Sequence, residues 1–230
     1  MTIRDSIIRL VGRHNLDEAE SAAAMNEIMS GVATPAQIAA FLTALHLKGE
    51  TAAEIAGMAR IMRDHALHVD VASGAVDTCG TGGDGAGTFN ISTIAAFVAA
   101  GAGVHIAKHG NRAMSSRCGS ADVLEGLGVS IELDQLEVAK RIRTQRFGFM
   151  FAPRFHPAMR FAGPVRREIG IRTAFNLLGP LTNPAKVTRQ VIGTANEALA
   201  EKLANALALL DMHYVIVFAG YGNIDELSLA

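Results

Sequence analysis

Residues 77–90 form a glycine-rich segment whose composition suits phosphate binding. The segment reads Asp-Thr-Cys-Gly-Thr-Gly-Gly-Asp-Gly-Ala-Gly-Thr-Phe-Asn, and five of its fourteen residues are glycine. The apolar pair Ala75-Val76 precedes it, and an apolar, helix-like run at 94–100 follows it. A strand, a glycine loop and a helix N-terminus in succession present several backbone N–H groups to a phosphate. The segment therefore predicts a phosphorylated ligand, although a glycine loop taken alone is more often a plain tight turn.

The glycine spacing excludes two common nucleotide-binding loops. Gly80-x-Gly82-Gly83-x-Gly85 departs from the dinucleotide pattern G-x-G-x-x-G, and no Gly-Lys-Ser/Thr follows as in a P-loop. The loop also contains an acid, Asp84, which cannot favour a phosphate directly. An acid in this position fits a site in which Mg²⁺ lies between the carboxylate and the phosphate.

A basic and polar cluster occupies residues 108–116. It reads Lys-His-Gly-Asn-Arg-Ala-Met-Ser-Ser and combines two permanent cations with an amide and two hydroxyls. Alone, such a cluster is usually a solvated loop. Beside a phosphate loop at the same sheet edge it predicts a second phosphate-binding group, because Lys, Arg and Ser all bind phosphate oxygens. Two such groups indicate a ligand that is phosphorylated at two ends.

Two adjacent carboxylates, Asp225 and Glu226, follow the last apolar run of the chain. Adjacent acids at the end of a strand can simply cap a helix. They can also bind Mg²⁺ directly or through water. Together with Asp84 they make a divalent-cation site a competitive interpretation.

The first seventy residues are predicted to be helical throughout. We expect helices over 3–14, 17–30, from Thr34 to Gly49, and over 51–65. Asp17 with Glu20, and Thr51 with Glu54, have the spacing of capping boxes, and Thr34-Pro35 is a typical helix start. The apolar stripes of this helical bundle are expected to form core or a dimer surface.

After Asp70 the pattern changes to alternating strands and helices, which predicts a mostly parallel α/β sheet. Strands are expected at 75–78, 104–107, 148–152, 190–194 and 214–219, and helices at 92–100, 120–127, 134–146, 157–169 and 197–210. The chemically notable segments, including the loop 153–156, then fall at the carboxyl ends of strands, where ligands bind. We expect a helical dimerisation domain at 1–70 and an α/β domain at 71–230, and part of 157–185 could pack with the helical domain.

Composition excludes several classes of protein. The 230 residues are 50% hydrophobic, and the formal net charge of −1 gives no bulk electrostatic case for nucleic acid. No run of eighteen apolar residues predicts a membrane span, and the start lacks a signal-peptide core. Cys79 and Cys118 lack metal-ligand spacing, so we expect a cytoplasmic protein with reduced thiols.

The motifs, taken in order, resemble the anthranilate phosphoribosyltransferase family from the N-terminal helices to the end of the chain. The segments that carry this resemblance are 77–85 (DTCGTGGDG), 90–93 (NIST), 108–112 (KHGNR), 115–125 (SSRCGSADVLE), 156–159 (HPAM), 165–166 (VR), 172–180 (RTAFNLLGP) and 225–226 (DE). The resemblance implies a helical domain with an α/β domain of the nucleoside phosphorylase-like phosphoribosyltransferase class, and a homodimer formed through the helical domain. It also implies the reaction of 5-phosphoribosyl 1-diphosphate with anthranilate, assisted by Mg²⁺, with two ions expected.

The resemblance also implies roles for individual residues. For the phosphoribosyl diphosphate it implies Gly80, Gly83, Asp84, Thr88, Asn90, Ile91, Ser92, Thr93, Lys108, His109, Gly110, Asn111, Arg112, Ala113, Met114, Ser115, Ser116 and Ser120. For anthranilate it implies Gly80, Asn111, His156 and Arg166, and for the metal Ser92, Asp225 and Glu226. Lys108, Arg112 and Asn111 are the expected catalytic residues, which neutralise charge and align the substrates. Arg167, next to Arg166, is a second candidate for the substrate carboxylate.

Two other functions share this scaffold. A pyrimidine nucleoside phosphorylase would use free phosphate and a nucleoside, whereas the 108–112 segment and the Arg166 region fit the anthranilate enzyme better. A non-catalytic nucleic-acid-binding paralogue should lose the glycine loop and gain a basic surface. The family's chains continue well beyond the position of Ala230, so we expect a C-terminally truncated sheet domain that is less stable than a complete one.

Overall fold

The structure is a computed structural model, and it describes residues 1–82, 84–113 and 118–228. Contacts divide the chain into two compact units. Unit 1 comprises residues 1–66, 156–182 and 205–210, and unit 2 comprises residues 67–155, 183–204 and 211–230. Among the described residues, no helix has the length and apolar character needed to cross a membrane.

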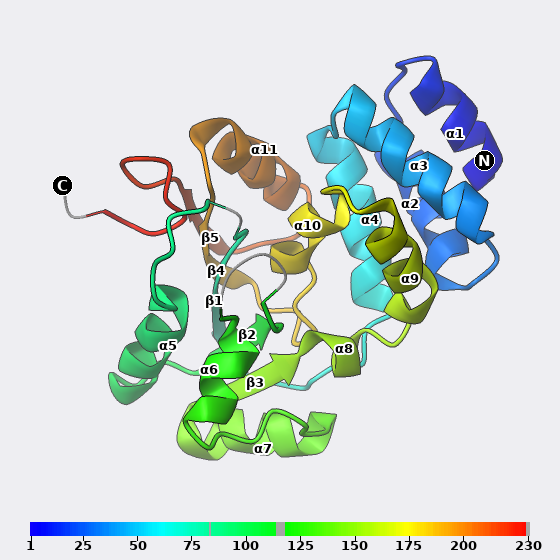
Figure 1. Cartoon of the computed structure of the whole chain (residues 1–230). Helices are drawn as coiled ribbons and strands as arrows, with labels where there is room; N and C mark the ends of the chain where they lie inside the picture. The colour runs from blue at the N-terminus through cyan, green and yellow to red at the C-terminus, as the bar shows by residue number, and fades with distance from the viewer. Residues whose placement is uncertain (83, 114–117, 229–230) are drawn as a thin grey trace. The chain divides into compact units, whose positions relative to one another are not determined.

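Unit 1 is built from helices (Figure 1). They are α1 (Ile3–Val11), α2 (Glu18–Met29), α3 (Pro35–Lys48), α4 (Ala52–Asp64), α9 (Met159–Ile169), α10 (Phe175–Leu178) and the 3₁₀ turn η1 (Gly179–Leu181). The predicted capping boxes at Asp17 and Thr51 are confirmed, as is the start at Thr34 with Pro35 in the first turn. These caps satisfy N–H groups that the first helical turn leaves without partners.

Helices α2 and α4 approach each other closely because Gly57 lies at their contact. A Cβ atom added at Gly57 would lie 2.2 Å from the carbonyl oxygen of Glu18 and 2.3 Å from the hydroxyl of Ser21. Ser21 is itself fully buried. The absence of a side chain at position 57 therefore sets the distance between these two helices.

Unit 2 is a five-stranded sheet in the order β3-β2-β1-β4-β5 (Figure 1). The strands are β1 (Val76–Gly80), β2 (Ile106–Gly110), β3 (Phe147–Phe151), β4 (Arg189–Gly193) and β5 (Tyr214–Phe218). All four pairings are parallel, which confirms the predicted α/β sheet. The chain moves from β1 outward to β3 and then returns to place β4 on the other side of β1. The ends of β1 and β4 are therefore the switch point at which parallel sheets bind ligands.

Helices cover the two faces of the sheet on the β1–β3 side. On one face, α5 (Ile91–Gly101) and α6 (Ser120–Gly126) share a core with Ile106, Phe147 and Phe149. On the other face, α7 (Gln135–Gln145) shares a core with Ala107 and Met150. The short helix α8 (Ala152–Phe155) follows β3, and α11 (Glu197–Ala208) connects β4 to β5.

The predicted position of the second strand was wrong by two to three residues. We expected a strand at 104–107 with Lys108 in the loop after it, but β2 runs from Ile106 to Gly110 and contains Lys108 and His109. Gly103 has φ of +105°, so the chain is still turning out of α5 there. The apolar pattern misled the prediction because strands buried on both faces usually read as apolar runs, whereas β2 contains the buried polar residues Lys108 and His109. The expected loop at 153–156 was also wrong, since α8 occupies most of it.

We predict that Gly57→Ala lowers the free energy of unfolding by about 1–3 kcal/mol, because the added methyl group overpacks the α2–α4 contact. The matched control is Gly163→Ala in α9, where an added Cβ meets only the Arg167 guanidinium at 3.8 Å. That change should leave stability unchanged or raise it by up to about 1 kcal/mol, since alanine favours helices. Urea titration of both variants measures the two effects; equal stability would contradict the packing argument.

Candidate functional site

The ends of β1 and β4 lie directly under the segment that carries Asp225. A Cβ at Gly80, the last residue of β1, would lie 2.5 Å from Oδ2 of Asp225. A Cβ at Gly193, the last residue of β4, would lie 1.7 Å from the Asp225 carbonyl oxygen. Only glycine at these two strand ends leaves room for this approach. The segment after β5 therefore returns across the switch point and places a carboxylate there.

Asp225 also ties its segment to the glycine loop. The Gly82 N–H donates to Oδ2 of Asp225 at 2.9 Å, and the Asp225 N–H donates to Oδ2 of Asp84 at 3.3 Å. Within the loop, the Ala86 N–H donates to Oδ1 of Asp84 at 3.2 Å. The two segments that sequence analysis associated with a metal thus meet, and they bring Asp84 and Asp225 together.

Two carboxylates in this region, those of Asp225 and Glu226, have raised pKa values. Burial, followed by the charges of Asp225 and Asp84, raises the pKa of Glu226 to about 7. The pKa of Asp225 is also raised, by burial first and by Asp84 second. Carboxylates with this mutual repulsion favour a bound cation, which removes both the repulsion and the desolvation penalty.

The described residues contain no ready-made set of three converging His, Cys, Asp or Glu ligands. This arrangement is compatible with Mg²⁺, because Mg²⁺ keeps several waters and takes one or two carboxylates along with substrate phosphates. The donor set at the switch point, two to three carboxylates and the Ser92 hydroxyl, is oxygen only. It therefore fits a hard divalent cation.

Lys108 lies in the sheet and is 2% exposed. Its Nζ donates to the carbonyl oxygen of Thr78 and, at 3.4 Å, to Oγ of Ser92. Burial lowers its pKa, and the charge of Asp77 is the largest effect that opposes this. Lys108 is thus an internal cation that links β1, β2 and the start of α5, in contrast to the solvated loop that the sequence pattern left open.

Helix α5 begins where the resemblance places the phosphates. Asn90 is its N-cap residue, and Ile91, Ser92 and Thr93 form its first turn. The Asn90 amide donates to the carbonyl oxygen of Cys118 at 3.2 Å, so the start of α5 contacts the segment after β2. The buried Thr93 hydroxyl has no hydrogen-bond partner among the described atoms.

A buried polar network under the sheet was missed by sequence analysis. Asp77, fully buried in β1, accepts from the His109 N–H at 3.2 Å, the Asn183 amide at 2.8 Å and the Gln190 amide at 3.2 Å. Asn183 also donates to the Ala107 carbonyl oxygen at 2.8 Å. Burial raises the pKa of Asp77, and these hydrogen bonds oppose the rise. A lone acid in an apolar strand, as at position 77, is the sequence signal for such a network, since buried carboxylates need partners.

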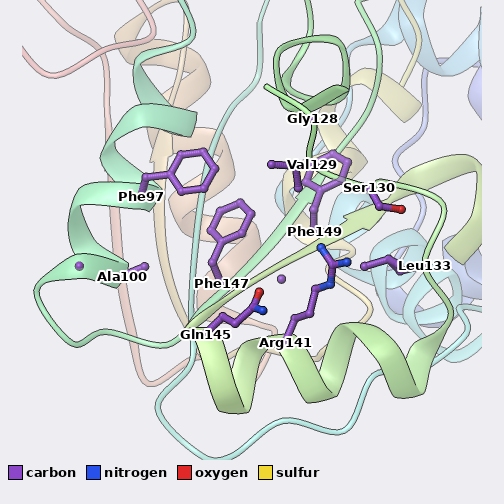
Figure 2. Close-up of a pocket in the computed structure, with 12 residues that line it drawn as sticks. Phe97, Ala100, Gly128, Val129, Ser130, Leu133, Arg141, Gln145, Phe147 and Phe149 are labelled. Carbon is purple, nitrogen blue, oxygen red and sulfur yellow. The ribbon is translucent and has the colours of Figure 1, made fainter. Parts of the chain in front are cut away.

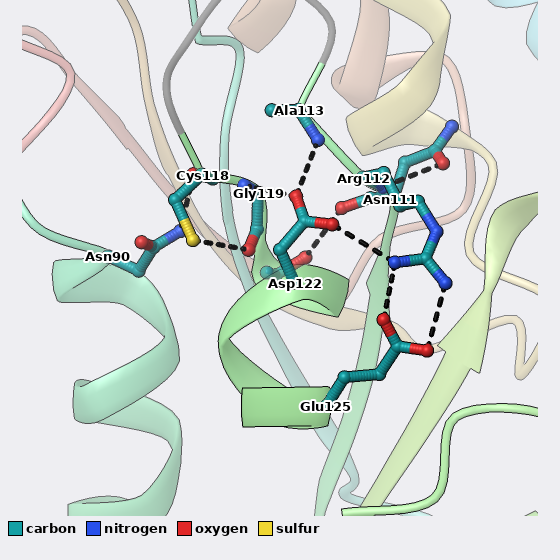
Figure 3. Close-up of polar contacts among 9 residues, drawn as sticks. Asn90, Asn111, Arg112, Ala113, Cys118, Gly119, Asp122 and Glu125 are labelled. Atoms are coloured by element: carbon teal, nitrogen blue, oxygen red, sulfur yellow. Dashed lines mark hydrogen bonds and ion pairs between the residues drawn. The ribbon is translucent and has the colours of Figure 1, made fainter. Parts of the chain in front are cut away.

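Arg112 is not free to act as an isolated cation. Its guanidinium forms a bidentate pair with Glu125 and a hydrogen bond of 3.1 Å to Asp122, both in α6 (Figure 3). It also lies 5.5 Å from the centre of the Phe151 ring. The pKa of Glu125 is lowered by this hydrogen bonding. Asn111 and Ser120 lie next to this group, and Oγ of Ser120 donates to the Asn111 carbonyl oxygen at 3.3 Å.

The other residues predicted to bind a phosphorylated ligand lie in the glycine loop, at the end of β2 and in the segment that follows β2. Thr88 is exposed in the glycine loop, and Ala113 donates its N–H to Asp122 at 3.0 Å. Gly110 ends β2 beside Ser120, where an added Cβ would lie 2.2 Å from the Ser120 hydroxyl. The predicted residues Gly83, Met114, Ser115 and Ser116 lie outside the described residues.

His156 and Arg166 belong to unit 1. His156 is buried. Arg166 lies in α9, and its guanidinium is 5.0 Å from the centre of the Phe175 ring. Burial lowers its pKa, with no carboxylate among the causes, whereas Arg167 is exposed. Of the two arginines, Arg166 is therefore the one whose partly buried charge would gain most from an anionic ligand.

A cavity of about 420 Å³ lies elsewhere in unit 2 (Figure 2). It is lined by Phe97, Ala100, Gly101, Gly128, Val129, Ser130, Leu133, Arg141, Gln145, Phe147, Gly148 and Phe149. These residues gather around the start of β3, at the opposite end of the strands from Gly80 and Gly193. None of the site residues predicted from the sequence lines this cavity. The switch point remains the better candidate site, because its carboxylates and the Ser92 hydroxyl can bind a hard cation.

Two domain families match the chain. A glycosyl transferase helical bundle domain matches residues 4–66, and a glycosyl transferase α/β domain matches residues 72–230. The anthranilate phosphoribosyltransferases of Chloroflexus aggregans and Chloroflexus aurantiacus are each 68% identical over 230 residues, which is all of this chain and 68% of each relative.

Solved structures give the same similarity. The anthranilate phosphoribosyltransferase of Thermus thermophilus superposes with a TM-score of 0.90 at 47% identity, over 98% of this chain and 68% of that one. The enzyme of Saccharomyces cerevisiae, solved in complex with PRPP and Mg, superposes with a TM-score of 0.90 at 31% identity, over the same shares. A further structure of the yeast enzyme, which matches at 30% identity with a TM-score of 0.85 and covers 98% of this chain and 66% of that one, contains 4-fluoroanthranilate.

We predict that Gly193→Ala displaces the segment after β5, because the new Cβ would collide with the Asp225 carbonyl oxygen. The free energy of unfolding should fall by about 1–3 kcal/mol, and amide hydrogen exchange in residues 220–226 should accelerate. Gly101→Ala, at a position where an added Cβ meets no atom within 4 Å, is the control. Unchanged exchange in the Gly193 variant would mean that Asp225 is not held by this contact.

We predict that the metal-free protein loses stability as the pH rises from about 5 to 8. The pKa of Glu226 in the folded chain, about 7, lies above its ordinary value of 4.5, so between these values the folded state binds more protons than the unfolded state. The free energy of unfolding then decreases with increasing pH across this window. Glu226→Gln should flatten the dependence, measured by urea titration in EDTA, whereas Glu201→Gln at an exposed position of α11 should retain it. Identical slopes in wild type and Glu226→Gln would refute the assignment.

Proposed function

Because this chain belongs to the anthranilate phosphoribosyltransferase family, a family of glycosyltransferases, we propose which of its residues carry out the family's reaction. That reaction moves the 5-phosphoribosyl group from 5-phosphoribosyl 1-diphosphate to the amine of anthranilate and releases pyrophosphate, a step of tryptophan synthesis. The single observation that carries the assignment is the contact between Asp84 and Asp225 at the switch point, close enough to Glu226 and Lys108 for their charges to interact. The relatives' identity of 68% also favours this reaction over a nucleoside phosphorylase or a nucleic-acid-binding role.

We propose that Asp225, Glu226 and Ser92 hold Mg²⁺, with two ions bound together with the substrate. When bound, Mg²⁺ would neutralise charge on the diphosphate and so make it a better leaving group. The oxygen-only donor set and the raised pKa of Glu226 support a cation here. The Lys108 ammonium, through its hydrogen bond, fixes the Ser92 hydroxyl and adds one positive charge next to Glu226.

The diphosphate end is proposed to bind at the glycine loop and the first turn of α5. The residues are Gly80, Gly83, Asp84, Thr88, Asn90, Ile91, Ser92 and Thr93. The N-terminus of this eleven-residue helix carries a positive partial charge, which favours anions. The buried Thr93 hydroxyl, which has no partner among the described atoms, is available to a phosphate oxygen.

The ribose phosphate is proposed to bind along the end of β2 and the segment that follows it. The residues are Lys108, His109, Gly110, Asn111, Arg112, Ala113, Met114, Ser115, Ser116 and Ser120. The Asn90–Cys118 hydrogen bond connects this segment to the diphosphate-binding turn, so the two phosphate-binding groups hold one ligand at both ends. Such fixation of both ends aligns C1 of the ribose with its attacking partner.

Anthranilate is proposed to bind through Gly80, Asn111, His156 and Arg166. The Arg166 guanidinium matches a carboxylate in shape and charge, and its partial burial without an acidic partner among the described residues supports an anionic ligand. The aromatic amine then forms a bond to C1 as the C1–oxygen bond to pyrophosphate breaks, and the amine loses its proton. An aromatic ammonium is a strong acid, so no general base is required. No nucleophilic cysteine is required either, and burial raises the pKa of Cys79 well above its usual value.

We also propose a homodimer formed through unit 1 and a cytoplasmic location. Several large apolar side chains of unit 1 are exposed, among them Ile8, Val11, Val32 and Leu47, which are 64–71% exposed. Such side chains on helical surfaces favour association. Neither Cys79 nor Cys118 forms a disulfide, which is compatible with a reducing compartment.

The direct test follows anthranilate fluorescence in the presence of phosphoribosyl diphosphate and Mg²⁺. We predict a decrease of the signal that requires both additions and that Asp225→Asn slows by more than about 100-fold, beyond the effect typical of an outer-shell metal partner. Glu201→Gln, an isosteric change of an exposed acid on α11, should retain the wild-type rate. A decrease that continues without Mg²⁺, or in Asp225→Asn at the wild-type rate, would refute the proposed site.

A further inference from the structure

The cavity at the start of β3 combines an aromatic wall with a permanent cation (Figure 2). The Phe97 and Phe147 rings stack with their centres 4.4 Å apart, and Phe149 also lines the cavity. Arg141 is the charged residue of the lining. The volume of about 420 Å³ lies within the range of about 300–1,000 Å³ that is usual for small-molecule sites. The cavity is therefore large enough for a ligand with one aromatic ring.

Helix α7 supplies two polar groups to this cavity. Arg141 and Gln145 are four residues apart, so they lie on one side of the helix. Figure 2 shows both side chains rising from α7 towards the phenylalanine rings. A guanidinium and an amide thus face an apolar cavity from the same helix, and an anionic group placed above α7 meets both.

The Arg141 guanidinium has no partner within the described ranges of the chain. It forms no hydrogen bond, ion pair or ring contact with another described side chain. Glu137, one turn earlier on α7, instead accepts from the Asp134 N–H at 3.2 Å in the capping box of the helix. An arginine that faces an apolar cavity without a partner favours a ligand carboxylate, because the guanidinium fork binds both carboxylate oxygens.

We propose that this cavity is a second ligand site, which binds a small aromatic monocarboxylate. The ring of the ligand packs against the phenylalanine side chains, and its carboxylate pairs with Arg141 and accepts from the Gln145 amide. The site does not depend on the proposed function, because none of its lining residues belongs to the proposed transferase site.

The alternative is that Arg141 only covers apolar surface. A long cationic side chain can lay its methylene groups over phenyl rings and keep its charge in water. The two roles differ in whether the ligand must be charged. A covering side chain gives no preference for an anion, whereas a guanidinium that binds carboxylate does.

Two probes of nearly equal shape, phenylacetate and phenylacetamide, test the proposal on the unmodified protein. Backbone amide chemical shifts, followed by NMR during titration, give both Kd and the location of binding. We expect phenylacetate to shift the amides of residues 97–101, 128–133 and 141–149. It should bind on the order of tenfold more tightly than phenylacetamide, because hydrogen bonds between ionised groups are stronger than those to a neutral amide.

Arg141→Gln removes the charge and retains a polar side chain. It should raise the Kd of phenylacetate on the order of tenfold and leave that of phenylacetamide unchanged. Its melting temperature should equal that of the wild type, since the guanidinium has no partner among the described residues to lose. The matched control is Arg143→Gln, which neutralises an exposed arginine of the same helix and should leave both Kd values unchanged.

The proposed anthranilate site also contains an arginine, so Arg166→Gln separates the two sites. It should slow the transferase assay and leave the phenylacetate shifts in the cavity unchanged. Shifts that are absent from the cavity and that disappear elsewhere in Arg166→Gln would put the probe at the transferase site. That result would overturn the cavity site and support the proposed function.

Three further results would overturn the cavity site: no binding of either probe, equal affinity for both probes, or an equal Kd for phenylacetate in wild type and Arg141→Gln. Equal affinity would make Arg141 a covering side chain. An inactive wild-type protein that still shows the expected cavity shifts would overturn the proposed function alone, and the cavity site would stand.

Discussion

The close approach of the Asp225 segment to the ends of β1 and β4 is the contact on which the candidate site depends. It requires glycine at positions 80 and 193, since a Cβ at either would meet Asp225. The parallel order of the strands brings those two ends together, and the return of the chain after β5 places an acid over them. The proposed metal ligands Asp225 and Glu226 thereby lie close to the glycine loop and the start of α5, although more than a hundred residues separate them in the sequence.

Beneath this contact, buried charge keeps the central strands in place. Asp77 in β1 binds the backbone of β2 at His109 and the amides of Asn183 and Gln190, while Lys108 in β2 binds the Thr78 carbonyl oxygen in β1. Each of these groups would destabilise the fold if its partners were lost, because a buried polar group without partners is costly. Asp77 and Lys108 therefore hold together the strands that carry the site. Their hydrogen bonds fix the strand positions in addition to any role in the chemistry.

The sequence predicted the helical unit, the parallel sheet and the segments that meet at the switch point, because caps, glycine loops and strand–helix alternation are local patterns. It misplaced Lys108 in a loop, since the apolar run before β2 hides the position at which the strand begins. It left the partners of Arg112 unassigned, because only α6 packed against the segment brings Asp122 and Glu125 within hydrogen-bonding distance. It could not show that Gly193 accommodates Asp225, as that need arises from two segments that meet only in the folded chain.

The strand order also determines when the site can exist during folding. The pairing of β1 with β4 joins Val76 to Arg189, so the loop that must close is far longer than that between β1 and β2. Closing long loops costs chain entropy before the contacts form, and pairings of this kind slow folding. A chain that has formed only β1, β2 and β3 contains the glycine loop and Lys108 but lacks the end of β4, at Gly193, against which Asp225 packs. Competence to bind is therefore acquired late, with the last strands to be added, and the nascent chain passes through a stage in which its apolar sheet edge is open to association.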